Sequence, residues 1–209
     1  MTKSNRLAAD IQSKIDDFWE RFALPILPKN LTPNQLSLLR LALVPALAAL
    51  FYFKLFLPAL LLFIAAALLD SLDGALARRR NLITSLGLIV DPLADKLLIA
   101  VTGWSLLFYY PFKMLLAGII ILEIMIGLAS AFALIGEDIK SSINKSNIWG
   151  KLKMVLQSLG LAGIMLWLLS GWPLLAIGSF YILAASFFCQ IISGAIYLKK
   201  PQPDKKILP

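Results

Sequence analysis

The chain has 209 residues, of which 59% are hydrophobic, and its mean hydropathy is +0.81. Soluble domains contain roughly 45–50% apolar residues, so this composition excludes a soluble domain and indicates a protein that crosses the membrane several times. The net charge of +8 predicts basic loops against anionic lipid rather than nucleic-acid binding, and the absence of histidine excludes Ser-His-Asp hydrolysis and histidine-ligated zinc.

Residues 1–30 have the pattern of an amphipathic helix rather than of a secretory signal. Their apolar side chains recur at spacings of three and four residues: Leu7, Ile11, Ile15, Phe18 and Phe22. Such spacing forms one apolar stripe on a helix. We expect an interfacial helix with Trp19 near the lipid headgroups; the alternative is a helix packed on another protein surface.

Six apolar segments follow, each close to the roughly 20 residues that a membrane span requires. They lie at about 35–53, 57–77, 86–109, 114–135, 152–170 and 173–198. The predicted fold class is therefore all-α, a polytopic membrane protein with six transmembrane helices. Residues 31–198 would form the membrane domain, and residues 199–209 a basic tail. Cys189, the single cysteine, is expected to be a buried small hydrophobe.

The basic residues predict the orientation in the membrane. Most of them fall in the N-terminal segment, in the loops after the second and fourth spans, and in the tail. Because loops rich in lysine and arginine stay in the cytoplasm, an even number of spans places both termini there. We expect a multi-pass protein of the cell inner (cytoplasmic) membrane, with residues 78–80 facing the cytoplasm.

Four aspartates lie where these spans approach the same loop. Asp70 and Asp73 are three residues apart near the end of the second span, and Asp91 and Asp95 are four apart near the start of the third. Each spacing places both carboxylates on one helix face. Because clustered carboxylates cannot all remain ionised and unpaired in a low dielectric, we expect one or two divalent cations here. Oxygen ligands favour Mg²⁺ or Mn²⁺.

The alternative for the aspartates is structural pairing with basic residues that lie in or beside the spans, namely Arg40, Arg78 and Lys96. Two carboxylates could be neutralised in this way. Four in register, accompanied by Gly74 and Gly87, favour a site where a ligand approaches the backbone closely. The sequence therefore predicts a metal-dependent site at the cytoplasmic boundary of the membrane.

The aspartates belong to a longer motif, DxxDGxxAR, which starts at Asp70 and is followed after eight residues by GxxxDxxxD, which ends at Asp95. This motif resembles the signature of the CDP-alcohol phosphotransferases, and the resemblance extends over residues 31–197. In that family, six helices surround a cytoplasm-facing site. The resemblance implies an enzyme of phospholipid synthesis that transfers a phosphatidyl group from CDP-diacylglycerol to an alcohol and releases CMP.

The resemblance also implies roles for individual residues. Asp70, Asp73, Asp91 and Asp95 would bind two Mg²⁺ or Mn²⁺ ions, and Asp95 would also deprotonate the acceptor alcohol. The CDP-lipid would be bound by Thr32, Pro33, Asn34, Asp73, Gly74, Ala77, Arg78 and Gly87. The implied partners are CDP-diacylglycerol, a polyol or polyol-phosphate acceptor, the bilayer and a second copy of the chain in a homodimer, and no nucleic acid.

The acceptor is indicated by Lys151 and Lys153, which lie at the predicted start of the fifth span. Lysines beside a helix N-terminus suit an anionic acceptor, although positive-inside charge alone is the alternative. The segment "GKLK…Q" resembles bacterial phosphatidylglycerophosphate synthases, which favours glycerol 3-phosphate. Those enzymes usually carry Arg-Glu where this chain has Leu122 and Glu123, so inositol phosphate, phosphatidylglycerol and other polyols stay open. From other classes, a divalent-metal carrier and a non-catalytic lipid-binding scaffold are the alternatives.

Overall fold

The computed structural model describes residues 17, 19–21, 32–80, 87–136 and 148–198. Its helices are α2 (Pro33–Tyr52), α3 (Phe56–Arg80), α4 (Gly87–Leu107), α5 (Lys113–Gly136), α7 (Ile148–Ser170) and α8 (Pro173–Leu198). Every labelled element in the described part of the chain is an α-helix, which confirms the predicted all-α class.

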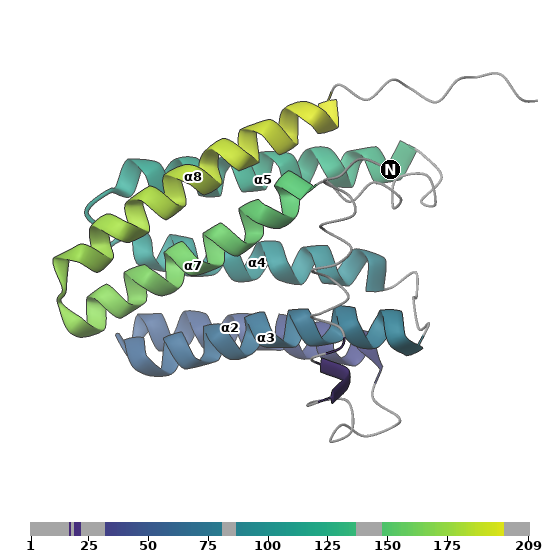
Figure 1. Ribbon diagram of the computed structural model, residues 1–209, viewed down its shortest axis with the longest axis horizontal. Helices are drawn as coiled ribbons and strands as arrows, with labels where there is room; N and C mark the ends of the chain where they lie inside the picture. The colour runs from purple at the N-terminus through teal and green to yellow at the C-terminus, as the bar shows by residue number, and fades with distance from the viewer. Residues whose placement is uncertain (1–16, 18, 22–31, 81–86, 137–147, 199–209) are drawn as a thin grey trace, which may run out of the picture.

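The helices lie alongside one another in a single bundle (Figure 1). Around the bundle, α2 contacts α3, α3 contacts α7, α7 contacts α8, α8 contacts α5, α5 contacts α4, and α4 returns to α2. Contacts of α4 with α7 and α3 cross the interior of this ring. Residues from distant parts of the sequence can therefore meet inside the bundle.

Short connections reverse the chain between neighbouring helices. Lys54 has φ 58° between α2 and α3, and Gly171 has φ +70° between α7 and α8. A glycine adopts this left-handed conformation without steric cost, so Gly171 suits the tight reversal. Because the helices alternate in direction, the end of α2 and the start of α3 lie at one end of the bundle. The start of α2 and the end of α3 lie at the other.

The buried side chains divide between the two ends of the bundle. The apolar core is built from the second halves of α2, α4 and α7 and the first halves of α3, α5 and α8, with Leu47, Phe63, Leu106, Ile119, Met165 and Leu183 at its centre. The buried charged and amide side chains come from the opposite halves, except for Glu123 near the middle of α5: Arg40, Asp73, Glu123, Lys153, Gln157 and Gln190. Apolar packing therefore stabilises one half of the bundle, and a polar interior occupies the other.

The chain is a multi-pass membrane protein. Within the described residues, four helices are long and apolar enough to cross a bilayer: Asn34–Tyr52, Phe56–Asp73, Leu152–Ser170 and Pro173–Ala195. Large apolar side chains on the outside of the bundle, such as Leu61, Trp104 and Phe188, would face lipid. Cys189 is buried, as predicted. The crossing of the bilayer by α4 and α5 remains a prediction.

Two helix ends differ from the predicted spans by more than one or two residues. α3 continues to Arg80, so residues 78–80 belong to its last turn rather than to the loop. α7 begins at Ile148, about one turn before the predicted span, so Lys151 lies inside the helix. The hydrophobic stretch marks the part of a helix that crosses lipid, whereas arginine and lysine continue the helix well beyond it.

The described part of the N-terminal segment contacts the bundle. The indole Nε1 of Trp19 donates a hydrogen bond to Ser71 Oγ at 2.8 Å, and its ring packs against Leu36, Leu72 and Leu76. The half-buried Trp19 therefore contacts α2 and α3, and its expected position near the lipid headgroups stays a prediction. The rest of the expected amphipathic helix and the basic tail at 199–209 lie outside the described residues.

Candidate active site

A buried arginine marks the polar half of the bundle. The inward face of α2 consists of residues spaced three and four apart, including Leu36, Ser37, Arg40, Val44 and Leu47, all of them buried. The Arg40 side chain is completely inaccessible to solvent. An unpaired charge in such a position would cost several kcal/mol, so its partners define the site.

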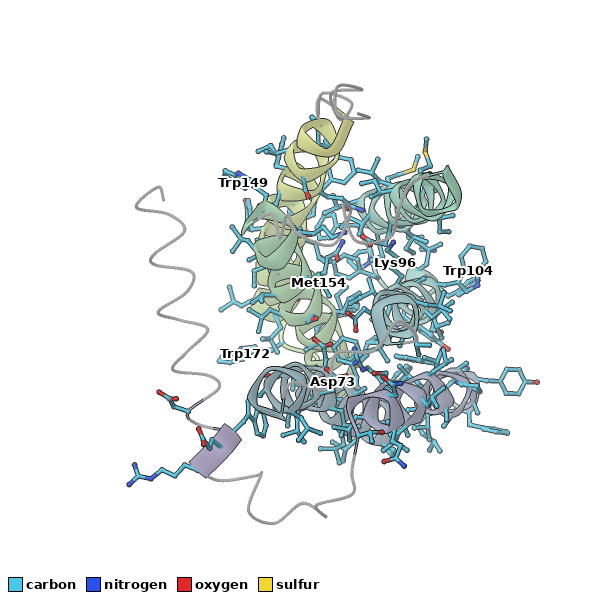
Figure 2. The ribbon with its side chains drawn as sticks, turned by 90° about the vertical axis from the view of Figure 1, so that its right-hand side faces the viewer. Asp73, Lys96, Trp104, Trp149, Met154 and Trp172 are labelled. Atoms are coloured by element: carbon cyan, nitrogen blue, oxygen red, sulfur yellow. The ribbon has the colours of Figure 1, made fainter. Side chains whose placement is uncertain are left out.

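Three aspartates surround the guanidinium of Arg40. Its Nη1 lies 2.6 Å from Asp70 Oδ1 and also donates to Asp95 Oδ1, while Nη2 donates to Asp73 Oδ2. Asp70 and Asp73 project from α3 and Asp95 from α4, so the cluster connects three helices. Figure 2 shows Asp73 among the polar side chains between the helices. The spacing of three residues places Asp70 and Asp73 on one face of α3, and packing of α2 and α4 brings Asp95 to the same guanidinium.

Ser37 adds a further contact to this cluster. Its Oγ donates to Asp73 Oδ2 at 3.4 Å, and both side chains are buried. Asp70 is the most exposed of the three aspartates, with 42% of its side chain accessible, against 6% for Asp73. The cluster is therefore closed on the side of α2 and open to a ligand beside Asp70.

The charges of this cluster favour binding of a further cation. Three carboxylates face one guanidinium, which leaves excess negative charge in the interior of the bundle. Within the described residues, no group of three aspartate, glutamate or cysteine side chains has the arrangement of a formed metal site, and the three aspartates are arranged around Arg40 instead. The donors are hard carboxylate oxygens, and their chemistry fits Mg²⁺ or Mn²⁺. The side chain of Asp91, the fourth predicted ligand, lies outside the described part.

A second buried polar cluster lies between α5, α7 and α8. Glu123 accepts hydrogen bonds from Lys153 Nζ at 2.6 and 2.9 Å, from Gln190 Nε2 at 2.9 Å and from Gln157 Nε2 at 3.4 Å. Gln157 Nε2 also lies 3.4 Å from Gln190 Oε1. Glu123 is therefore the shared acceptor that holds three helices together.

Lys96 connects the two clusters electrostatically. It follows Asp95 in α4, is half-buried, and lies within electrostatic range of Glu123, Lys153 and Asp95. Figure 2 shows Lys96 and Asp73 on the polar side of the bundle interior. Two ammonium groups and one guanidinium thus accompany the four carboxylates of the two clusters.

The structure describes some of the predicted site residues but not the side chains of others. It brings Asp70, Asp73 and Asp95 together, and it places Thr32 and Asn34 at the start of α2, at the same end of the bundle. Thr32 is the N-cap of that helix, and its backbone N–H donates to Gln35 Oε1 at 3.0 Å. Other predicted side chains lie outside the described part: Pro33, Gly74, Ala77, Arg78, Gly87, Asp91 and Lys151. Their roles stay predictions.

Lys153 lies in a different environment from the one expected of it. It is buried and paired with Glu123, so its charge already has a counter-charge. The sequence analysis assigns no role to Ser37, Gln157 or Gln190, although Gln157 belongs to the segment "GKLK…Q", and it treats Arg40 only as a structural partner. A detectable signal existed for Gln157 and Gln190, because amide side chains are costly in apolar spans and usually meet other polar groups there.

Comparisons with known proteins agree with the motif. The profile of the family described as CDP-alcohol phosphatidyltransferase matches residues 30–192. A Rickettsia typhi protein named "CDP-diacylglycerol--glycerol-3-phosphate 3-phosphatidyltransferase" is 36% identical over 180 residues, covering 82% of this chain and 96% of that protein. A Mycobacterium tuberculosis protein named "Probable phosphatidylglycerophosphate synthase" is 32% identical over 179 residues, covering 82% of this chain and 81% of that protein.

A solved structure supports the fold. The crystal structure of Mycobacterium tuberculosis phosphatidylinositol phosphate synthase with CDP-DAG bound superimposes with a TM-score of 0.59. The match covers 96% of this chain and all of the other, at 19% sequence identity. At this identity the likeness concerns the fold alone.

Proposed function

Since the chain belongs to the CDP-alcohol phosphatidyltransferase family, we propose that it synthesises phosphatidylglycerophosphate, with glycerol 3-phosphate as the acceptor. Family membership establishes an enzyme of phospholipid synthesis that transfers a phosphatidyl group from CDP-diacylglycerol to an alcohol. The acceptor is inferred from the Rickettsia typhi relative, which is similar over 96% of its own length and carries glycerol 3-phosphate in its name.

The polar interior supports a phosphorylated acceptor. Lys96 and Lys153 place two ammonium groups in the half of the bundle that holds the aspartates. A lysine binds phosphate as a point charge. We infer that Lys151 and Lys153 bind the acceptor phosphate, and that Glu123 fixes the position of Lys153 for this contact.

The reaction we propose uses the aspartates in two ways. Asp70, Asp73, Asp91 and Asp95 would hold one or two divalent ions, which supply positive charge to the diphosphate of CDP-diacylglycerol. The Asp95 carboxylate accepts the proton of the acceptor hydroxyl. The hydroxyl oxygen forms a bond to the phosphorus that carries diacylglycerol, and the bond from that phosphorus to CMP breaks. Thr32, Pro33, Asn34, Gly74, Ala77, Arg78 and Gly87 would bind the nucleotide of the donor.

The division of the bundle into halves suggests how this enzyme lies in the membrane. We propose that six helices cross the bilayer, that the polar half faces the cytoplasm, and that both termini lie there. Residues 31–198 would form the catalytic domain, with residues 1–30 at the membrane interface and 199–209 as a cytoplasmic tail. A soluble nucleotide and a membrane-bound diacyl chain can meet at this boundary. A homodimer in the cell inner (cytoplasmic) membrane is part of the same proposal.

The same division argues against a divalent-metal carrier. A carrier needs polar groups along its whole path through the membrane. The buried side chains described in the other half of the bundle are predominantly apolar. The acidic cluster is therefore better suited to chemistry at one membrane face than to transport.

The proposed acceptor can be tested directly with the purified protein. It would be supplied with CDP-diacylglycerol, Mg²⁺ and one of several acceptors: glycerol 3-phosphate, inositol phosphate, inositol or phosphatidylglycerol. The lipid product would be identified by its mass, and CMP release would be measured alongside it. We expect phosphatidylglycerophosphate from glycerol 3-phosphate. A product formed only from another acceptor would contradict the proposed acceptor but leave the family reaction intact.

A further inference from the structure

Arg40 touches one carboxylate oxygen of each of three aspartates that come from two different helices. From this geometry we infer that Arg40 is a positioning residue of the metal site, which holds the ligands of the cation in place without binding the cation itself. This inference rests on the metal site of the proposed function. It adds a contribution from α2 to a site whose predicted metal ligands all lie on α3 and α4.

The contacts with Arg40 divide the oxygens of the aspartates. Arg40 bonds to Oδ1 of Asp70, Oδ1 of Asp95 and Oδ2 of Asp73. Each carboxylate has a second oxygen, so one oxygen can accept from the guanidinium while the other ligates a cation. Hydrogen bonds of this kind orient the ligands of many metal sites and contribute strongly to metal affinity.

The shape of arginine matters for this role. A guanidinium presents several donors in one rigid plane, whereas a lysine ammonium is a single point on a flexible chain. Here Nη1 reaches carboxylates on both α3 and α4, and Nη2 reaches a third. One lysine could keep the positive charge but could not hold three carboxylates in the same arrangement.

The surroundings of Arg40 hold the guanidinium in position. Its side chain has no exposed surface, and it lies on a buried face of α2 between Ser37 and Val44. Ser37 Oγ donates to Asp73 Oδ2, the oxygen that Arg40 Nη2 also contacts. Two residues one helical turn apart on α2 therefore act on the same carboxylate oxygen, as expected of a surface that orients Asp73.

A role in positioning differs from a role as a simple counter-charge. A counter-charge would compete with the cation, so its removal would strengthen metal binding. A positioning residue improves the arrangement of the ligands, so its loss weakens metal binding even when the charge is kept. Arg40→Lys separates the two, because it conserves the charge and removes the planar group.

The experiment measures Mn²⁺ binding to the full-length protein in detergent, using the electron paramagnetic resonance signal of free Mn²⁺. We expect Arg40→Lys to weaken Mn²⁺ affinity by roughly 10- to 100-fold, as is typical for loss of such an orienting contact. Ser37→Ala should weaken it by a smaller factor. Ser186→Ala is the matched control, because Ser186 is a buried serine on α8 that donates to its own helix at Leu183 O.

The outcomes are distinct. Unchanged or tighter Mn²⁺ binding by Arg40→Lys, with a wild-type protein that binds Mn²⁺, would overturn the positioning role and leave the metal site intact. A wild-type protein that binds no Mn²⁺ would overturn both. Melting temperatures measured in parallel identify a general loss of fold, which alone would not change the affinity of the folded fraction. If Arg40→Lys does not fold, the test rests on Ser37→Ala. A Mn²⁺ affinity of Ser37→Ala equal to that of Ser186→Ala would then contradict the inference.

Discussion

Lys153 Nζ lies 2.6 Å from Glu123 Oε2, and both side chains are buried between α5, α7 and α8. Breaking a buried ion pair from one side leaves an uncompensated charge, which costs about 3–5 kcal/mol. We expect Glu123→Gln and Lys153→Met each to reduce the free energy of unfolding by an amount of that order. In the double variant, neither position carries a charge, and the new glutamine still offers Gln190 a hydrogen-bond acceptor. It should therefore recover at least half of the lost free energy of unfolding.

Denaturant titrations of the four proteins in detergent would test this coupling. Lys113→Met serves as a control, because Lys113 is exposed at the start of α5 and its loss should change stability little. If the effects of Glu123→Gln and Lys153→Met simply added in the double variant, the two residues would not be energetically coupled.

The acceptor lysines are tested by kinetics rather than by stability. Loss of a charge-assisted hydrogen bond costs about 1.5–3 kcal/mol, which corresponds to roughly a ten- to hundredfold loss of affinity. We therefore expect Lys151→Ala to raise the acceptor KM by about that factor, with little change in the KM for CDP-diacylglycerol. Lys153→Ala should raise the acceptor KM as well, and it should also destabilise the bundle.

The result for the two lysines can also contradict the acceptor. The acceptor KM could be unchanged in the Lys151→Ala, Lys153→Ala double variant. The lysines would then contribute only to the positive charge on the cytoplasmic side and, for Lys153, to the ion pair with Glu123. An uncharged alcohol would then be the better candidate, and the mass of the lipid product would identify it.

Much of this fold could be predicted because the signals are local. Apolar runs of about 20 residues place the helices, and the spacing of three residues between Asp70 and Asp73 places both carboxylates on one face of α3. The ends of α3 and α7 were less predictable, since hydrophobicity marks the extent of lipid contact and not the end of hydrogen bonding. Helices continue through lysine and arginine at little cost.

The partners of the polar residues could not be predicted in the same way. Whether Arg40 meets the aspartates depends on how α2 packs on α3 and α4, which no local pattern specifies. Glu123 and Lys153 are 30 residues apart, and Gln190 is 67 residues from Glu123. The sequence places Lys153 near a helix start but does not indicate its counter-charge, because Glu123 lies on another helix.

Close packing of α7 and α8 depends on Gly160. A Cβ atom at this position would lie 2.6 Å from Leu183 Cγ, a fully buried side chain. We expect Gly160→Ala to destabilise the protein by about 1–3 kcal/mol, as overpacking of a core does. Gly178→Ala is the matched control on α8, because its Cβ would meet no atom within 4 Å.

Leu183→Ala tests the cause of that loss. Alone it should destabilise the protein by about 2–5 kcal/mol through the cavity it leaves. Combined with Gly160→Ala, it should cost less than the sum of the two, because the added methyl group then has space. Equal losses for Gly160→Ala and Gly178→Ala would show that close packing at Gly160 is not the cause.

The proposed base is tested by a substitution that keeps its shape. Asn at position 95 keeps the shape and one acceptor oxygen, which can ligate a cation or accept from Arg40, but it cannot take a proton. General bases contribute roughly 10²- to 10⁴-fold to rate, so we expect Asp95→Asn to lower kcat by at least about that range. Binding of CDP-diacylglycerol should be retained, as measured by equilibrium binding in detergent.

Asp70→Asn provides the comparison for this base, because Asp70 also contacts Arg40 but is proposed only as a metal ligand. We expect it to raise the Mg²⁺ concentration needed for half-maximal rate, with partial recovery of kcat at saturating Mg²⁺. Asp95→Asn should show no such recovery, since added metal does not replace a proton acceptor. Near-normal turnover of Asp95→Asn at saturating Mg²⁺ would show that another group takes the proton and that Asp95 only helps to bind the metal.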